Sequence, residues 1–418
     1  MKSIASMLLI IALGFGLAGC PGGGGGGGGS SSAFAVSTTS ADFGVVDNAY
    51  TSTLATTGGT APFSWTLFGG ALPVGLSLNA TTGVVSGTPT VAGNSTADFI
   101  VTDSTGQTAN GSVLFAVHPR TDRASVNSNG VAGSGASSSP SISGDGSLVA
   151  FASSSSNFVP GVGGTQIYVH NRQTNQIEVI SRDNDTAVVN EGGAASSDPA
   201  ISADRRYVAF VSQATNLLAP APAVPAGQQI YVRDRQTGVT SLVSVDNTGA
   251  SIPGDGISSG PSISGDGRYV AFVSQATNLL APAPAVPAGQ QIYVRDRQTG
   301  VTSLVSVDNT GASIPGDGIS SGPSISGDGR YVAFVSVATN LLAPDPVVLG
   351  GQQIYVRDRQ LGLSSLASQD NTNTNIEGAG GISDTPSMNS DGRFVAFFSQ
   401  ATNLVSGSGA HIYVRALP

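Results

Sequence analysis

A repeat of about 62 residues constrains this chain of 418 residues more than any other feature. One marker, Pro-Ser-Ile-Ser or a close variant, begins at Pro140, Pro199, Pro261, Pro323 and Pro386, with spacings of 59, 62, 62 and 63. A second marker, Ile-Tyr-Val, begins at Ile167, Ile230, Ile292, Ile354 and Ile412. A fixed period of this length indicates small units that bury their apolar faces against one another.

Each unit is predicted to form four antiparallel strands. In the unit that begins at Pro261, we expect a tight Asp-Gly turn at Gly265–Gly267, because Gly adopts the positive φ that such turns need. The expected strands are 262–264, 269–274, 292–295 and 302–307. Four antiparallel strands per unit predict the blade of a β-propeller.

The repeat motifs also resemble a known family. Ser-Gly-Asp-Gly-Arg-Tyr-Val-Ala-Phe at 264–272 and Ile-Tyr-Val-Arg-Asp-Arg at 292–297 are similar to the TolB-like, WD-like propeller repeats of bacterial periplasmic proteins. The resemblance implies a β-propeller over residues 119–418. It leaves the function open, because propellers carry many functions.

The ends of the array predict how the propeller closes. The last repeat stops at Pro418, before a fourth strand, and the segment 122–127 matches 303–308 of an inner repeat. An open sheet edge favours aggregation, so we expect the N-terminal strand to complete the last blade. The prediction is a closed ring of five blades.

The first 32 residues predict export and an anchor. Lys2, an apolar run at 7–13 and Leu17-Ala-Gly-Cys20 form a signal peptide over residues 1–20. Leu-Ala-Gly-Cys resembles the bacterial lipobox, which implies lipid on Cys20 and a partner membrane. The expected location is the outer membrane, on its periplasmic side or at the cell surface. Residues 21–32 form a flexible Gly/Ser tether.

Residues 33–118 predict a small β-sandwich ahead of the propeller, which makes the whole chain all-β. Alternating runs at 63–68 and 97–102 are typical of strands. The stretches 72–78 and 82–89 resemble the Ig-like modules of bacterial surface proteins. Trp65, the chain's one tryptophan, is expected to anchor the sandwich core.

Composition excludes several classes of function. A net charge of −9 gives no basic footprint for nucleic acid. Cys20 is the one cysteine, so disulfides within the chain and cysteine zinc sites are excluded. We expect no cofactor and no metal. Related repeats carry Asp before Ile-Tyr-Val where this chain has Gln or His, which argues against calcium.

The long loops predict a binding face. They join the second to the third strand and one unit to the next, and therefore lie at one end of the blades. Three of them are apolar, and we expect them to form a continuous rim that binds envelope proteins or peptides. Its members are Leu217, Leu218, Val224, Leu279, Leu280, Val286, Leu341, Leu342 and Asp345. The chain is thus interpreted as a non-enzymatic binding or scaffold lipoprotein of unassigned oligomeric state.

Other interpretations stay open. A glycan-active enzyme would need acids that are not repeated, and the candidates are Glu178, Asp183, Asp185 and Glu191. A structural envelope spacer is the other alternative. The G-x-S-x-G matches at 256–260 and 318–322 are interpreted as coincidence, because the helix and histidine of a nucleophile elbow are not expected there. The repeated Arg-Asp-Arg predicts ion pairs, with an anion-binding arginine ring as the alternative.

Overall fold

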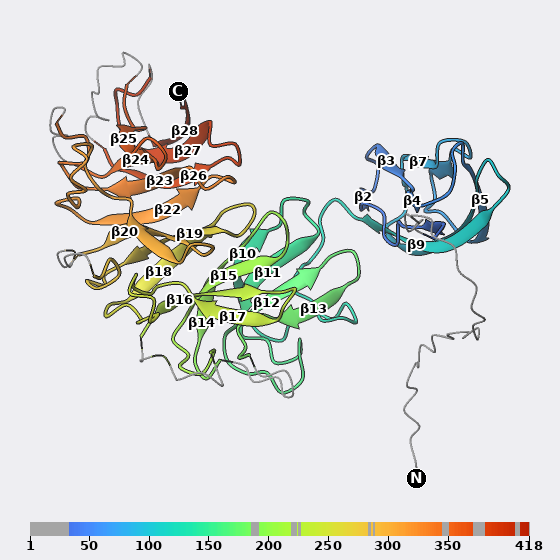
Figure 1. The fold of residues 1–418 in the computed structure, drawn as a ribbon, viewed down its shortest axis with the longest axis horizontal. Helices are drawn as coiled ribbons and strands as arrows, with labels where there is room; N and C mark the ends of the chain where they lie inside the picture. The colour runs from blue at the N-terminus through green and yellow to red at the C-terminus, as the bar shows by residue number, and fades with distance from the viewer. Residues whose placement is uncertain are drawn as a thin grey trace, which may run out of the picture. The chain divides into compact units, whose positions relative to one another are not determined.

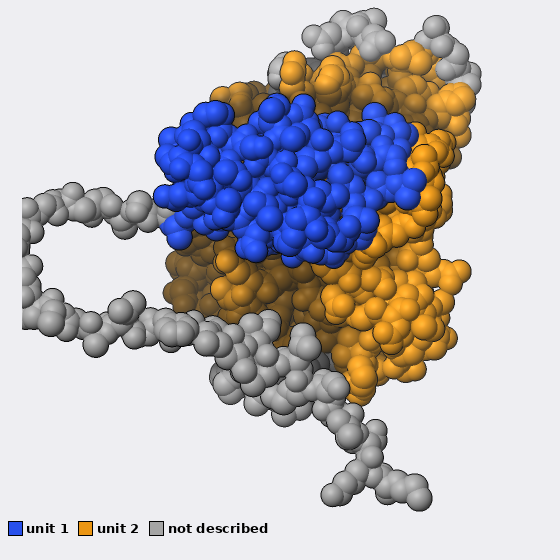
Figure 2. Space-filling model, turned by 90° about the vertical axis from the view of Figure 1, so that its right-hand side faces the viewer, with its two compact units in different colours: residues 1–41, 49–88, 95–114 blue, residues 42–48, 89–94, 115–418 orange. Residues whose placement is uncertain are grey.

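The computed structural model describes residues 33–184, 192–218, 224, 227–282, 286, 289–344, 351–370, 381–405 and 410–417. All regular elements in these ranges are β-strands, as the sequence predicts (Figure 1). The chain divides into two compact units, shown in Figure 2. One unit holds residues 1–41, 49–88 and 95–114, and the other holds 42–48, 89–94 and 115–418. The predicted signal peptide, the tether and Cys20 lie outside the described residues.

The first nine strands form the small sandwich. One sheet has the order β2-β9-β8-β5 and another has the order β3-β7-β6, while β1 pairs with β4. Phe99 is fully buried and Trp65 is buried, which confirms the predicted core role of the tryptophan. The strands are β1 Ala35–Val36, β2 Gly44–Val45, β3 Tyr50–Thr53, β4 Thr56–Thr57, β5 Ser64–Gly70, β6 Leu76–Leu78, β7 Val84–Gly87, β8 Gly93–Thr102 and β9 Thr108–His118.

Five antiparallel sheets follow one another from residue 137 to 416, and we number them blades 1 to 5. Each blade runs in sequence order, so each strand pairs with the next one along the chain. Blade 1 contains β10 Ser137–Ile142, β11 Leu148–Ser153, β12 Gln166–Asn171 and β13 Gln176–Val179. Blade 2 contains β14 Ser196–Ile201, β15 Tyr207–Ser212, β16 Gln229–Asp234 and β17 Val239–Leu242.

The inner blades repeat this arrangement, and the last blade is shorter. Blade 3 contains β18 Ser258–Ile263, β19 Tyr269–Ser274, β20 Gln291–Asp296 and β21 Val301–Leu304. Blade 4 contains β22 Ser320–Ile325, β23 Tyr331–Ser336, β24 Gln353–Asp358 and β25 Leu363–Leu366. Blade 5 contains β26 Ser383–Met388, β27 Phe394–Ser399 and β28 His411–Ala416.

The core lies between blades rather than within one sheet. Ile292 and Val294 on one side of blade 3 pack into a cluster with Phe334 and Tyr355 of blade 4. Within each sheet an aromatic pair fixes the register, as where Phe334 lies opposite Tyr355 with ring centroids 5.9 Å apart. Because a sheet has two faces, each blade can contribute one half of the junction before it and one half of the junction after it.

The first strand of each blade has a bulge that explains its proline. In blade 3 the register between β18 and β19 shifts between Ser259 and Ser262, around Gly260 and Pro261. A proline has no N–H to donate, so in a sheet it is placed at such irregularities or at edges. The strand therefore begins at Ser258, four residues before the predicted start at 262.

The structure does not confirm ring closure by the N-terminal strand. The last sheet has the order β26-β27-β28, and no described residue adds a fourth strand to it. Instead, Val126 forms a bridge with Ala132, as Val307 does with Pro315 ahead of blade 4. The segment after residue 124 thus folds as the loop that leads into blade 1, and Arg172 of blade 1 forms an ion pair with Asp122 just before it.

Candidate functional site

The blades present two unlike ends. The turns from first to second strand and from third to fourth strand lie at one end, which we call the short-turn face. The longer connections from second to third strand, and those from blade to blade, lie at the other end, which we call the long-loop face. This division follows from antiparallel strands joined in sequence order.

The predicted apolar rim on the long-loop face is wrong for the residues that can be placed. Leu279 is fully buried, in a cluster with Phe272 and Tyr293, and Val286 is buried in the same cluster. Leu280 is partly buried against it. The loops turn these side chains inward because burial removes more apolar surface from water than exposure at a rim.

The equivalent residues of the neighbouring blades behave in the same way. Leu217, Val224, Leu341 and Leu342 are buried, and Leu218 is partly buried against the same kind of cluster. Asp345 lies outside the described residues. The described apolar side chains of these loops therefore cover the blade junctions, and a binding surface on this face has to be made by other residues.

A row of isoleucines on the long-loop face is exposed instead. Ile257, Ile319 and Ile382 are 45%, 56% and 45% exposed, and each immediately precedes the first strand of its blade. The first strands β18, β22 and β26 of blades 3, 4 and 5 contact one another in succession. Equivalent positions on these strands are therefore neighbours, and the three side chains form what we call the isoleucine row.

The isoleucine row lies within the segments that match G-x-S-x-G. The serine of the first match, Ser258, is fully buried, and its hydroxyl donates to Ser274 Oγ at 2.9 Å. A buried hydroxyl committed to another serine does not suit a nucleophile, so the geometry supports the interpretation as coincidence. Sequence reasoning examined these segments for the serine and missed the isoleucine beside it, whose repetition at an offset of 62 was the available signal.

Exposed acids accompany the row. Asp255 and Asp317 each stand two residues before an isoleucine of the row and are exposed. The Asp255 carboxylate accepts hydrogen bonds from the backbone N–H and the hydroxyl of Thr277, both at 2.6 Å. Partial burial opposes the effect of these bonds, but the pKa of Asp255 is still lowered. The carboxylate is therefore a fixed negative charge at neutral pH.

No described cluster of three or more His, Cys, Asp or Glu side chains could hold a metal ion. Of the acids considered for an enzyme, Glu178 forms an ion pair with Arg235. Asp183 is buried. Asp185 and Glu191 lie outside the described residues. Glu178 is thus part of a blade-to-blade ion pair.

On the short-turn face the Arg-Asp-Arg repeats have partners within the chain. The central acid Asp296 receives two hydrogen bonds from Arg268, at 3.0 and 2.7 Å. This contact lowers the pKa of Asp296 to about 2. The first arginine, Arg295, donates to the Asp246 carbonyl at 3.0 Å and to Thr302 Oγ1 at 2.9 Å.

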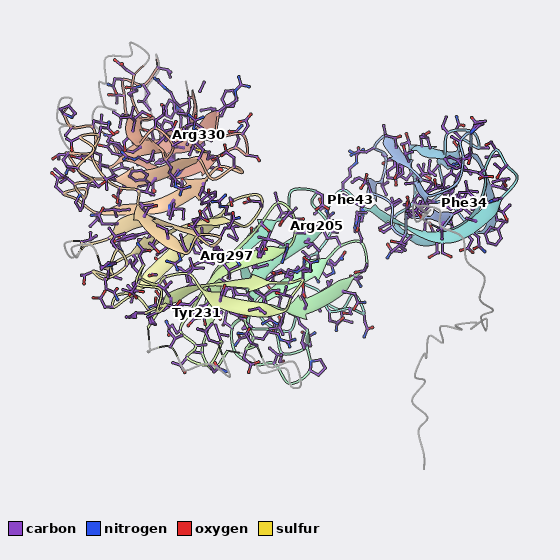
Figure 3. All side chains as sticks on the ribbon, viewed as in Figure 1. Phe34, Phe43, Arg205, Tyr231, Arg297 and Arg330 are labelled. Atoms are coloured by element: carbon purple, nitrogen blue, oxygen red, sulfur yellow. The ribbon has the colours of Figure 1, made fainter. Side chains whose placement is uncertain are left out.

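The second arginine of each repeat connects two blades. The Arg297 guanidinium lies 4.3 Å from the centre of the Tyr207 ring of blade 2 and donates to the Gly267 carbonyl at 2.7 Å. Arg359 stacks over Tyr269 in the same way at the next junction, at 4.5 Å. Such contacts favour the structural interpretation of the repeated charges. Figure 3 labels Arg205, Arg297 and Arg330, which belong to three successive blades.

Small cavities accompany these contacts. Their volumes are about 350 Å³ beside Arg297 and about 360 Å³ beside Arg359. A cavity of about 450 Å³ lies at the first junction, where Leu148 and Arg205 stand in place of the tyrosine and the glycine. The arginines that line these cavities already contact carboxylates, carbonyls or aromatic rings of the chain. Their guanidinium groups therefore have little capacity left to bind an anion.

No described helix is long and apolar enough to cross a membrane.

Comparisons with known proteins bear on each unit separately. Residues 29–118 match the family model described as "Putative Ig domain". No curated protein matches the chain. Among solved structures, the chain is similar to the "putative TolB" of Agrobacterium tumefaciens, with 16% identity, a TM-score of 0.39, and coverage of 68% of this chain and 91% of that one.

Two other solved structures are similar at the same low level. The acylaminoacyl peptidase of Pyrococcus horikoshii has 13% identity and a TM-score of 0.38, over 78% of this chain and 42% of that one. The Cps50 (Swd1) β-propeller domain of Myceliophteria thermophila has 9% identity and a TM-score of 0.34, over 85% of this chain and 89% of that one. This chain thus spans less than half of the peptidase.

Proposed function

We propose that this chain is a non-catalytic binding or scaffold protein of the cell envelope, which uses its long-loop face to recognise a peptide segment of another protein. The observation that carries the proposal is the isoleucine row. Ile257, Ile319 and Ile382 are exposed at one repeated position, just before the first strand, in three successive blades. A contiguous apolar strip between polar surfaces is typical of a protein interaction site.

The position of the row favours binding over chance exposure. Val239, Val301 and Leu363 are also exposed at one repeated position, by 49%, 50% and 49%. They begin the fourth strands β17, β21 and β25, and no two of these strands are among the closely contacting strand pairs of the described residues. The isoleucines immediately precede the first strands β18, β22 and β26, which do contact one another. One ligand can therefore cover the isoleucine row more easily than the outer positions.

The chemistry of the row indicates the kind of segment. Full burial of an exposed isoleucine side chain contributes about 1.5–3 kcal/mol. The side chains of the row are about half exposed, so covering all three contributes about 2–5 kcal/mol, a part of the roughly 8 kcal/mol of a micromolar affinity. Asp255 and Asp317 place fixed negative charges beside the row. A segment that combines apolar and basic side chains would satisfy both features, since charges of opposite sign favour encounter.

The test compares two triple variants of the full chain. Ile257→Ser, Ile319→Ser and Ile382→Ser together should weaken binding to an immobilised peptide of alternating leucine and lysine by tenfold or more. The matched control, Val239→Ser, Val301→Ser and Leu363→Ser, should bind as the parent does. Circular dichroism checks that both variants fold.

Three outcomes would count against the proposal. Loss of binding in the control but not in the isoleucine variant would move the site to the short-turn face. Equal binding to a peptide of alternating leucine and glutamate would remove the role of the acids. Absence of binding by the parent chain would favour a structural spacer.

We also propose that the protein is anchored to a membrane through lipid on Cys20. Cys20 ends a lipobox-like segment and is followed by a run of eight glycines at 22–29. We expect Cys20→Ser to move the protein from the membrane fraction to the soluble fraction of the envelope. A variant that matures normally and stays with the membrane would rule out lipid on Cys20 as the anchor.

A further inference from the structure

The two ends of the blade array expose apolar surface that every inner blade buries. Ile412 and Val414 in blade 5 are 69% and 67% exposed, whereas the equivalent Ile354 and Val356 in blade 4 are 0% and 3% exposed. At the other end Ile142 of blade 1 is 59% exposed, while its equivalent in blade 2 is buried. Among the described residues, no blade packs on this side of blade 5 or on this side of blade 1.

These two surfaces are the two halves of an inner junction. At the junction of blades 3 and 4, the Ile and Val of the third strand (Ile292, Val294) pack against Ile325, Phe334 and Tyr355 of the next blade. Blade 5 offers the first half, with its exposed Ile and Val on β28. Blade 1 offers the second half through its exposed Ile142, while Phe151 and Tyr168, at the positions of the phenylalanine and tyrosine, are already buried against Phe158 of the same blade.

The polar contact of the inner junctions is also available at both ends. The backbone N–H of Met388 in blade 5 donates to Ser324 Oγ of blade 4 at 2.9 Å. Ile325 donates to Ser262 Oγ of blade 3 in the same way at 3.1 Å. By the offset of the repeats, Ser387 of blade 5 is the next serine and Ile142 of blade 1 is the next donor. Ser387 is exposed.

The last blade also has room for one more strand. A cavity of about 620 Å³ lies beside β25, and the residues that line it include Leu361, Leu363, Val356 and Leu417. In an inner blade the fourth strand covers this position, and its leucine packs against the blade before, as Leu304 does. With three strands, blade 5 leaves the position open and leaves the outer edge of β28 unpaired among the described residues.

Blade 1 carries a segment in the right place to fill that position. The loop 125–133 is built like 306–316, since the N–H of Gly133 donates to the Ser125 carbonyl as that of Gly316 donates to the Ser306 carbonyl. Residues 121–124 therefore correspond to residues 302–305, which cover most of the fourth strand β21 of the blade before and the residue after it. Asp122 is held at blade 1 by Arg172, with the two side chains 3.2 Å apart.

We propose that the two ends join between molecules: blade 5 of one copy packs on blade 1 of a second copy, and residues 121–124 of the second copy pair with β28. In a single molecule Ile142 of blade 1 and Ile412 and Val414 of blade 5 are exposed, whereas the equivalent side chains at the inner junctions are buried. A second copy can meet either end without a change at any inner junction. Such a head-to-tail contact extends into a chain of copies unless its rotation closes a ring.

The test uses cysteine pairs in a Cys20→Ser background, which removes the chain's own thiol. Ser387→Cys is made in one sample of the full chain and Ile142→Cys in another, and the two are mixed under mild oxidation. The proposal expects a disulfide-linked dimer in the mixture and little in either sample alone, because a disulfide needs Cα atoms about 4.4–6.8 Å apart. The combination Ser324→Cys with Met388→Cys is the control, since it places the same pair at a junction inside the molecule.

Two results would overturn the proposal. If the mixture gives no dimer while Ser387→Cys with Ile142→Cys in one chain gives an internal disulfide, the ends close within a single molecule. If neither forms while the inner control does, the ends do not meet at all. As a second measurement, Ile412→Ser with Val414→Ser should reduce the mass found by light scattering to that of one chain. None of these residues belongs to the isoleucine row, so this proposal and the proposed function can fail separately.

Discussion

Blades 4 and 5 contain the same tetrapeptide in opposite surroundings. Ile-Tyr-Val-Arg occupies 354–357 in the third strand of blade 4 and 412–415 in that of blade 5. The tyrosine stacks on the phenylalanine of the second strand with ring centroids 5.9 Å apart in both blades. The isoleucine and valine are buried in blade 4 and exposed in blade 5. The pairing of strands within a sheet is thus set by residues of that blade, whereas the burial of its isoleucine and valine depends on whether another blade packs on it.

The difference between blades 4 and 5 shows which contacts stabilise the array. In a repeat array, stability is approximately a sum of terms within each unit and terms between neighbours. Here the strands and turns belong to the unit, while most of the apolar core belongs to the junction between units. An end blade therefore keeps its local structure and lacks half of its core.

The largest expected effect separates the two isoleucines directly. Ile354→Ala should lower the free energy of unfolding of the blades by about 2–5 kcal/mol, because it opens a cavity in a filled junction. Ile412→Ala should change it by less than about 0.5 kcal/mol in dilute solution, where the end is free. Denaturant titrations followed by circular dichroism measure both, since Trp65 fluorescence reports on the other unit. Equal losses would show that blade 5 has a neighbour in the single molecule.

We predict that the close approach of Gly267 to Tyr207 is required at the junction of blades 2 and 3. Gly267 has a φ of +71°, and a Cβ there would lie 2.1 Å from Cδ2 of Tyr207 in blade 2. Gly267→Ala should therefore cost about 2–4 kcal/mol of unfolding free energy, from backbone strain and crowding together. Gly300→Ala is the control, since its φ of +70° is similar and the nearest atom to a Cβ there, Nη2 of Arg295, would be 3.7 Å away.

The first junction suggests how to relieve that crowding. At the positions of Gly267 and Tyr207 it has Arg205 and Leu148, and Arg205 tolerates a φ of +72°. Tyr207→Leu should therefore reduce the cost of Gly267→Ala when the two changes are combined. If the two losses simply add in a double-mutant cycle, the tyrosine ring is not the obstacle.

The smallest expected effect concerns the ion pair that the last blade lacks. Asp296→Asn removes the charge that faces Arg268 and should cost about 1 kcal/mol at neutral pH, because the arginine is partly exposed. In blade 5 the equivalent position is Ala416, next to the strand that begins after Arg393. Ala416→Asp should recover a few tenths of a kcal/mol there.

The pH dependence of this effect follows from the lowered pKa of Asp296. Its folded value of about 2 lies below the usual 3.8. The carboxylate therefore stabilises the fold fully above about pH 4, and the contribution is lost as the pH falls toward 2. The difference in unfolding midpoint between the parent and Asp296→Asn should shrink over that interval. A difference that stays constant from pH 5 to pH 2 would exclude the ion pair as its source.

Much of the unit could be predicted because its signals are local. The second strand was expected at 269–274 and is β19 with the same bounds. The fourth strand was expected to reach 307 and ends at Leu304, since the chain then turns to form the bridge between Val307 and Pro315. Turn glycines and alternating residues specify strands, but a bridge to a later loop leaves no such pattern.

The candidate site was harder to predict, because exposure depends on how loops fold back. The leucines of the long loops have the composition of an apolar rim, and the structure buries them over the junctions. The isoleucines of the row stand among glycine and serine, where the sequence shows no amphipathic pattern. Sequence composition could identify the apolar side chains, but not which of them the neighbouring blade covers.

The sequence by itself determined the repeating unit: its period, its strand order, its tight turns and the arginine and aspartate that form its ion pair. Each of these depends on residues within one unit, so the local pattern is sufficient. The tertiary structure decided which apolar side chains are core and which are surface, and it left the last blade with three strands. Those outcomes depend on contacts between units, because the same Ile-Tyr-Val-Arg is buried when another blade packs on it and exposed when none does.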